Sequence, residues 1–146
     1  MKPRKTAREK IETAPKAKIV AISPGMRKRF GTGTMLIPHP SDVNDRIRKV
    51  PRGEVITLTQ LREKMAHAAG ADVACPLVTG LFIRIVAEAA ADEIKSGKSR
   101  VTPYWRVVRD DGRLLETLPG GPTEQARHLE AEGHSIDTSD KLRLIS

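Results

Sequence analysis

The chain has 146 residues and a formal net charge of +8, with 38% hydrophobic and only 3% aromatic residues. This length suits one ordinary domain, and its core must be built mainly from Leu, Ile, Val and Ala. No apolar run is long enough to span a bilayer, residues 1–18 lack the apolar stretch of a signal peptide, and the single cysteine excludes an intramolecular disulfide. We therefore expect a soluble cytoplasmic protein with no membrane partner and no cofactor.

Positive charge is concentrated at the front of the chain. Residues 1–53 carry 14 Lys and Arg against 4 Asp and Glu, whereas residues 54–146 carry 12 against 14. A basic arm of this kind commonly holds nucleic acid through its phosphates, with a strong dependence on salt. The alternative is a solvated tail that only keeps the protein soluble.

The first part of the chain is predicted to hold little regular structure. Residues 1–28 are rich in Lys, Arg, Pro and Ala without any period, which predicts a disordered basic arm. Residues 29–49 are predicted to form an extended segment and then a short helix, which begins at Ser41 or Asp42 and ends near Val50.

Residues 50–146 are predicted to form the main domain. Two helices are expected at its start, one capped by Thr57 or Thr59 and ended by Gly70, and one over residues 76–95. The second helix has the strongest periodic signal in the chain, an apolar stripe predicted to face the core: Leu77, Val78, Leu81, Phe82, Ile85, Val86 and Ala89. The face predicted to be exposed is small and nearly neutral: Thr79, Gly80, Ile83, Arg84 and Ala87.

A β-hairpin is predicted next, with a strand over residues 106–109, a turn at residues 111–112 and a return strand at residues 114–115. The carboxylates of the D-D-G turn are therefore assigned to turn geometry and not to catalysis. A last helix is expected over residues 122–132, followed by a tail that adds a strand or stays loose. Helix, loop, helix and hairpin is the order of a winged helix-turn-helix, so the predicted fold class is mainly α with a small β-hairpin.

Three motifs in this domain carry a resemblance to a known family. They are V-P-R-G-E-V-I-T-L-T-Q-L at residues 50–61, P-Y-W-R-V-V at residues 103–108 and H-L-E-A-E-G-H at residues 128–134. In order and spacing, over roughly residues 50–136, they resemble the DNA-binding domain of the O6-alkylguanine-DNA alkyltransferases. The resemblance implies a winged-helix domain that binds double-stranded DNA.

The second motif departs from the family at the residues that carry its chemistry. The family transfers an alkyl group from guanine to the Cys of P-C-H-R, whose thiolate the His activates. Here these positions are Tyr104 and Trp105. A phenol with a pKa near 10 accepts a methyl group poorly at neutral pH, and an indole cannot act as a base. We therefore expect no catalytic residue and no enzymatic activity.

This departure makes the chain most similar to the alkyltransferase-like proteins, which also lack the Cys. Those proteins bind alkylated DNA, flip the base into the vacant pocket and recruit repair factors. Three further family residues are missing here: Leu58 replaces a Tyr, Pro76 stands where the family has its arginine finger, and residues 95–98 lack the hinge Asn. The resemblance therefore implies a DNA-binding protein related to alkylation repair and, in its finer form, a damaged-base sensor without methyl transfer.

Two sets of candidate site residues follow. The predicted nucleic-acid contacts lie on the second helix and near the short helix before residue 50: Thr79, Gly80, Arg84, Arg46, Arg48, Lys49 and Arg52. The candidate base pocket consists of Tyr104, Trp105, Arg106 and Glu132, of which the last aligns with a Glu of the family. Two alternatives stay open for the pocket: the aromatic pair fills the core, and Arg106 only ties its loop to neighbouring segments.

The remaining alternatives concern the partner, the thiol and metals. Residues 76–95 carry a net charge of −1. The face of this helix that would contact DNA in the resembled family therefore also fits an adaptor that binds protein or RNA. Cys75 is expected to be either a small buried residue or a thiol made reactive by the following helix N-terminus. The four histidines are scattered without ligand spacing, which predicts no metal site.

Overall fold

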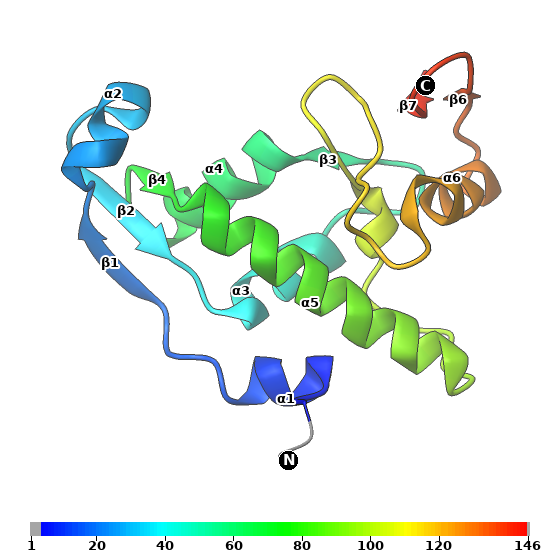
Figure 1. Ribbon diagram of the computed structural model, residues 1–146, viewed down its shortest axis with the longest axis horizontal. Coiled ribbons are helices and arrows are strands. Elements are labelled where there is room, and N and C mark those ends of the chain that lie inside the picture. The colour runs from blue at the N-terminus through cyan, green and yellow to red at the C-terminus, as the bar shows by residue number, and fades with distance from the viewer. Residues whose placement is uncertain (1–3, 146) are drawn as a thin grey trace.

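The computed structural model describes residues 4–145, which are organised around one long helix, α5 (Pro76–Lys95). Figure 1 shows α5 crossing the molecule, with other helices on several sides of it. Both α1 (Ala7–Glu12) and α3 (Pro40–Arg48) pack against α5, and α3 also packs against α4 (Leu58–Ala69). The strands are short, so the predicted mainly helical class with little β-structure is confirmed.

The front of the chain differs from the predicted disordered arm. Residues 1–3 of that arm lie outside the described residues, but residues 4–28 contain α1 and the strand β1 (Lys18–Ala21). The reason is that short apolar stretches between the lysines find tertiary partners. Ile11 of α1 packs against the main core, and β1 pairs antiparallel with β2 (Thr34–Ile37). A local reading of composition cannot show such long-range pairing.

A second group of elements connects this hairpin to the rest of the fold. Between β1 and β2 lie a 3₁₀ turn, η1 (Pro24–Met26), and a one-turn helix, α2 (Arg27–Phe30). On its other side β2 pairs in parallel with β4 (Val73–Ala74), giving the sheet order β1-β2-β4. The domain boundary at residue 50 stays a prediction. Helices α3 and α5, which lie on either side of it in the sequence, contribute to one core.

Local capping signals are obeyed with one exception. Thr57 caps α4 as predicted, and Gly70 ends it in the left-handed conformation at φ 75°. The cap of α3 is His39, not Ser41 or Asp42. The His39 Nδ1 atom accepts from the Ser41 backbone N–H at 3.0 Å, and the Asp42 carboxylate accepts from the His39 N–H at 2.8 Å. Imidazole thus takes the place that a hydroxyl or carboxylate usually fills.

The predicted hairpin at residues 106–115 is replaced by a different pairing. The strand β5 (Val107–Val108) pairs in parallel with β3 (Ile56–Thr57), and residues 114–115 form no strand. The tight turn does exist, because the Arg109 N–H donates to the Arg113 carbonyl at 2.9 Å. Beyond it, the N–H groups of residues 114 and 115 already have other acceptors, the Leu142 carbonyl and the Gln125 side chain. Their side chains are buried, so this segment packs into the core and cannot act as a free wing.

The C-terminal part completes the fold with one helix and a small hairpin. Helix α6 (Gly121–Ala131) coincides with the predicted last helix, and Glu132 follows it as the C-cap residue. The tail adds a strand, as one of the two predicted outcomes: β6 (Ile136–Asp137) pairs antiparallel with β7 (Arg143–Leu144). Within residues 4–145, no helix combines the length and the apolar character that a membrane span needs.

The buried face of α5 matches the apolar stripe that the periodicity indicated only in part. Ile85 and Val86 are buried as predicted, whereas Ile83 and Ala87, predicted to be exposed, are buried as well. Leu77 and Leu81, predicted to be buried, are 74% and 44% exposed. The buried residues of this helix are Thr79, Ile83, Ile85, Val86, Ala87 and Ala90. The physical reason is that α5 is apolar on nearly every side, and a helix of this kind has no single stripe that sequence alone can select. The position of its neighbours in the fold decides which side is covered.

Candidate nucleic-acid interface

A cavity of about 830 Å³ lies between the start of α4, the turn at residues 109–113 and α2. Four arginines from three segments border it: Arg29 of α2, Arg62 of α4, and Arg109 and Arg113 of the turn. A neighbouring groove of about 340 Å³ shares Leu58 and Arg109 with this cavity and adds Gly80, Leu81 and Arg84 of α5. We call the joined surface of the five arginines and Leu58 the arginine groove.

Four carboxylates also border the larger cavity, Asp110, Asp111, Glu116 and Asp140, and the first two act inside the fold. Asp110 accepts hydrogen bonds from the Thr59 backbone N–H at 3.0 Å and the Thr59 hydroxyl at 2.5 Å. Asp111 accepts from the Arg113 backbone N–H at 3.0 Å. The hydroxyl and N–H of Thr59 lower the pKa of Asp110, and the Arg113 N–H lowers that of Asp111. The Asp111 carboxylate thus helps to form the turn, as predicted, whereas the Asp110 carboxylate anchors the turn to the start of α4 through Thr59.

On α5 the predicted contacts separate into exposed and buried residues. Gly80 is exposed, and open space surrounds the position that a Cβ would take. Arg84 is about half-exposed and lies 3.8 Å from Glu88. Thr79 is only 1% exposed, so its prediction as a nucleic-acid contact is wrong. It belongs to the covered side of α5 together with Ile83, one helical turn further on.

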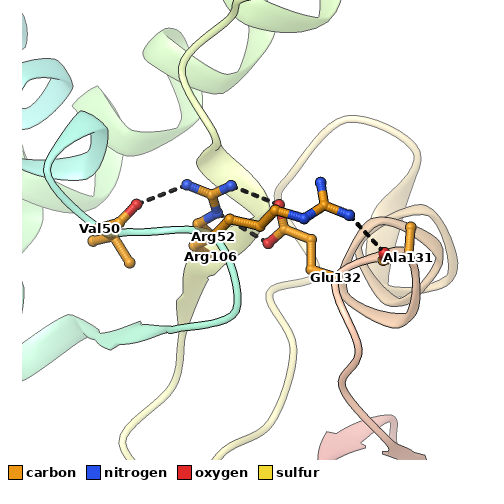
Figure 2. Close-up of polar contacts among 5 residues, drawn as sticks. All are labelled: Val50, Arg52, Arg106, Ala131 and Glu132. Atoms are coloured by element: carbon orange, nitrogen blue, oxygen red, sulfur yellow. Dashed lines mark hydrogen bonds and ion pairs between the residues drawn. The ribbon is translucent and has the colours of Figure 1, made fainter.

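The predicted cations near α3 lie apart from the arginine groove. Arg46 and Lys49 border two other cavities, which share no lining residue with the groove. Arg48 is exposed at the end of α3. Arg52 donates to the Ala131 carbonyl at 3.0 Å and so ties the end of α6 to the segment after α3 (Figure 2). These four residues therefore do not form one surface with Gly80 and Arg84.

The aromatic pair lies on the 3₁₀ turn η2 (Tyr104–Arg106) and is largely enclosed. Tyr104 is 2% exposed, and its ring meets Trp105 edge to face at a centroid distance of 5.2 Å. Trp105 stacks on His128 at 4.1 Å with an angle of 10° between the rings. Burial, followed by the charge of Glu124, raises the pKa of the Tyr104 phenol. The core-filling alternative for this pair therefore describes how it is packed.

A buried ion pair connects η2 to the end of α6. Arg106 donates to both Glu132 carboxylate oxygens, at 2.9 and 2.6 Å, and to the Val50 carbonyl at 2.7 Å (Figure 2). The side chains are 13% and 4% exposed. Burial on its own raises the pKa of Glu132, but the hydrogen bonds and charge of Arg106, the proximity of the Trp105 indole and the charge of Arg52 produce a net lowering. The Trp105 N–H itself makes no hydrogen bond of standard geometry.

This ion pair joins three segments that are far apart in the sequence. It supports the structural alternative for Arg106, because all of its guanidinium hydrogen bonds go to protein groups. The four candidate pocket residues thus form two contacts: an aromatic pair in the core and a buried ion pair beside it.

Cys75 and the histidines offer no centre for chemistry. Cys75 is 5% exposed and lies in a small apolar cluster with Ile22 and Met35, which agrees with the buried alternative. Across residues 4–145, no group of three or more His, Cys, Asp or Glu side chains is placed to hold a metal ion.

Sequence reasoning missed most of the arginine groove. Arg109 and Arg113 flank a predicted turn, and cations beside a turn are a weak sign of a binding loop. Arg29 and Arg62 carry no local signal, since they reach the groove only through tertiary packing. The exposure of Leu77 and Leu81 was also missed.

The comparisons with known proteins are as follows. The sequence matches no protein-family model and no curated protein. Among solved structures, the chain is similar to S. pombe Atl1, whose crystal structure contains damaged DNA with O6-carboxymethylguanine. The sequence identity is 20%, the similarity covers 72% of this chain and 86% of that chain, and the TM-score is 0.46. At this level of similarity, function has to be argued from the residues of this chain.

Proposed function

We propose that this chain is a non-enzymatic DNA-binding protein related to DNA alkylation repair, and that it binds duplex DNA through the arginine groove. One observation carries the proposal: five arginines from four segments of the chain border two neighbouring cavities that share Leu58 and Arg109. Lys and Arg that neutralise phosphates release counterions, which is the main source of sequence-independent DNA affinity. The exposed Gly80 next to Arg84 leaves room for close approach of a DNA backbone.

The absence of methyl transfer follows from the residue at the acceptor position. Tyr104 replaces the thiol that the family resemblance places there, and burial keeps its phenol protonated by raising its pKa. Cys75 is buried and belongs to a different part of the fold. In its finer form, the proposal is a sensor that prefers DNA containing an alkylated guanine and then engages a protein partner.

The DNA-binding proposal is tested with matched duplexes, with and without O6-methylguanine, by fluorescence anisotropy at several salt concentrations. Replacing Arg62 and Arg109 with alanine is expected to weaken binding about tenfold and to reduce the slope of log K against log salt by about 2, one for each lost phosphate contact. Arg48→Ala together with Lys49→Ala removes the same charge outside the groove and serves as the control. Equal losses in both variants would show that only net charge matters.

The lesion preference is read from the same titrations. Tighter binding to the O6-methylguanine duplex supports the sensor, whereas equal binding to both duplexes leaves a general DNA-binding protein. An absence of binding to either duplex refutes the DNA proposal.

An adaptor for protein or RNA is the second candidate, and the exposed leucines of α5 favour it. Leu77 and Leu81 lie one helical turn apart on the same side, 74% and 44% exposed, and Leu81 borders the arginine groove. Apolar side chains in this position fit the anchor of a protein interface. Substituting both with serine separates the two candidates: a protein complex would be lost, whereas phosphate-driven DNA binding would change little.

A further inference from the structure

The tip of the β1–β2 hairpin carries a cluster of positive charge. Residues 13–41 contain no Asp or Glu, and α2 within them presents Arg27, Lys28 and Arg29, all exposed. Among the ion pairs of the described residues, none involves these three cations. The Asp72 carboxylate lies at the base of the tip, where it accepts hydrogen bonds from Thr34. The exposed cations of α2 are outside the ion pairs of the described residues and are therefore available for an anionic partner.

The tip is held in place by the fold. The β1–β2 ladder pairs four residues on each strand, from Lys18 opposite Ile37 to Ala21 opposite Thr34. At the base of the tip, Ile22 is 2% exposed and forms a cluster with Met35 and Cys75, against which Met26 and Phe30 pack. Figure 1 shows α2 at the end of this hairpin, at the opposite end of the long dimension of the molecule from α6. Cations on a fixed support lose less conformational entropy on binding than those of a free arm.

The tip is also continuous with the arginine groove. Arg29 borders the same cavity as Arg62, Arg109 and Arg113. Its guanidinium lies 4.7 Å from the centre of the Phe30 ring, a cation–π contact that orients the side chain. Arg27 and Lys28 precede Arg29 in the same short helix and are exposed, so they add two positive charges next to the groove. A duplex offers negatively charged phosphates along its whole backbone.

We propose that α2 is a phosphate clamp, in which Arg27 and Lys28 contact the DNA backbone next to the segment held in the arginine groove. This inference rests on the proposed DNA-binding function, and it lengthens the stretch of duplex that the protein covers. The clamp carries no sequence preference, because phosphate contacts fix position on the duplex and do not read bases.

The test compares the full-length protein with Arg27→Gln together with Lys28→Gln, which leaves Arg29 and its ring contact intact. Anisotropy titrations of a duplex longer than the groove, over a series of salt concentrations, are expected to show the slope of log K against log salt reduced by about 2. Lys95→Gln together with Lys98→Gln removes the same charge at the end of α5 and is expected to leave the slope nearly unchanged. Far-UV circular dichroism confirms that each variant is folded.

The outcomes separate the clamp from the proposed function. If the wild type binds DNA and the Arg62/Arg109 variant binds it more weakly, but the α2 variant behaves like its control, the clamp is refuted and the proposed function stands. If the wild type does not bind DNA, both the clamp and the proposed function are refuted. The clamp would also be overturned if the α2 variant bound anionic lipid vesicles or an acidic protein more weakly than the wild type does, but bound DNA equally well.

Discussion

Replacing Arg106 with alanine is expected to lower the free energy of unfolding by about 3–5 kcal/mol, the usual result of removing one partner from a buried ion pair. The loss is large because Glu132 stays buried without its two charge-assisted hydrogen bonds, and the Val50 carbonyl also loses its donor. Denaturant unfolding followed by far-UV circular dichroism measures the change.

Two variants show whether burial is the cause. Arg113→Ala breaks the exposed pair with Asp111, where N and O are 3.1 Å apart, and should cost less than about 1 kcal/mol. Joint replacement of Arg106 with methionine and Glu132 with leucine removes both charges and should restore much of the stability. If Arg106→Ala costs no more than Arg113→Ala, the ion pair does not hold these segments together.

The same pair predicts a dependence on pH. The folded state lowers the pKa of Glu132, so its contribution to stability is complete above the carboxyl pKa of the unfolded chain and is lost as pH falls through the folded value. Without Arg106, burial dominates and should raise that pKa instead. Protonation then favours the folded state, so the destabilisation caused by Arg106→Ala should shrink as the solution is acidified.

Replacing Gln125 with alanine is expected to destabilise the protein by about 3–5 kcal/mol, because it opens a cavity and leaves buried backbone groups without partners. Gln125 is 1% exposed. Its carbonyl accepts from the Leu115 N–H at 2.7 Å, and its amide donates to the Trp105 and Val107 carbonyls at 3.0 and 2.7 Å. One side chain of α6 thus holds the segment after the turn against β5.

Gln125→Leu separates the two contributions, since leucine fills most of the volume and makes none of the hydrogen bonds. We expect it to recover only the cavity part of the loss in denaturant unfolding. A leucine variant as stable as the wild type would show that the three hydrogen bonds contribute nothing net. Both variants should also weaken DNA binding, because the position of Arg113 depends on this segment.

Several features of the fold could be predicted from short stretches of sequence. Thr57 and Gly70 mark the ends of α4 because capping and left-handed backbone are local properties of the residue type. The Asp111 carboxylate closes its turn for the same reason, because it accepts from the backbone N–H two residues further along the chain.

The candidate site could not be predicted in the same way. Leu77 is exposed and Thr79 is buried, the reverse of the prediction. The reason is that α5 is apolar on nearly all sides, so only its neighbours decide which side is covered. The strand at Val107 has its partner at Ile56, far back in the sequence, and not in the segment that follows it.

By itself, the sequence determined the approximate positions of α4, α5 and α6, the caps of α4 and the turn at residues 111–112, because each depends on residues within a few positions of one another. Only the tertiary structure ordered the basic segment and brought Arg29, Arg62 and Arg109 to one groove. These arginines come from three separate segments, and a surface of this kind exists only after long-range packing has placed them side by side.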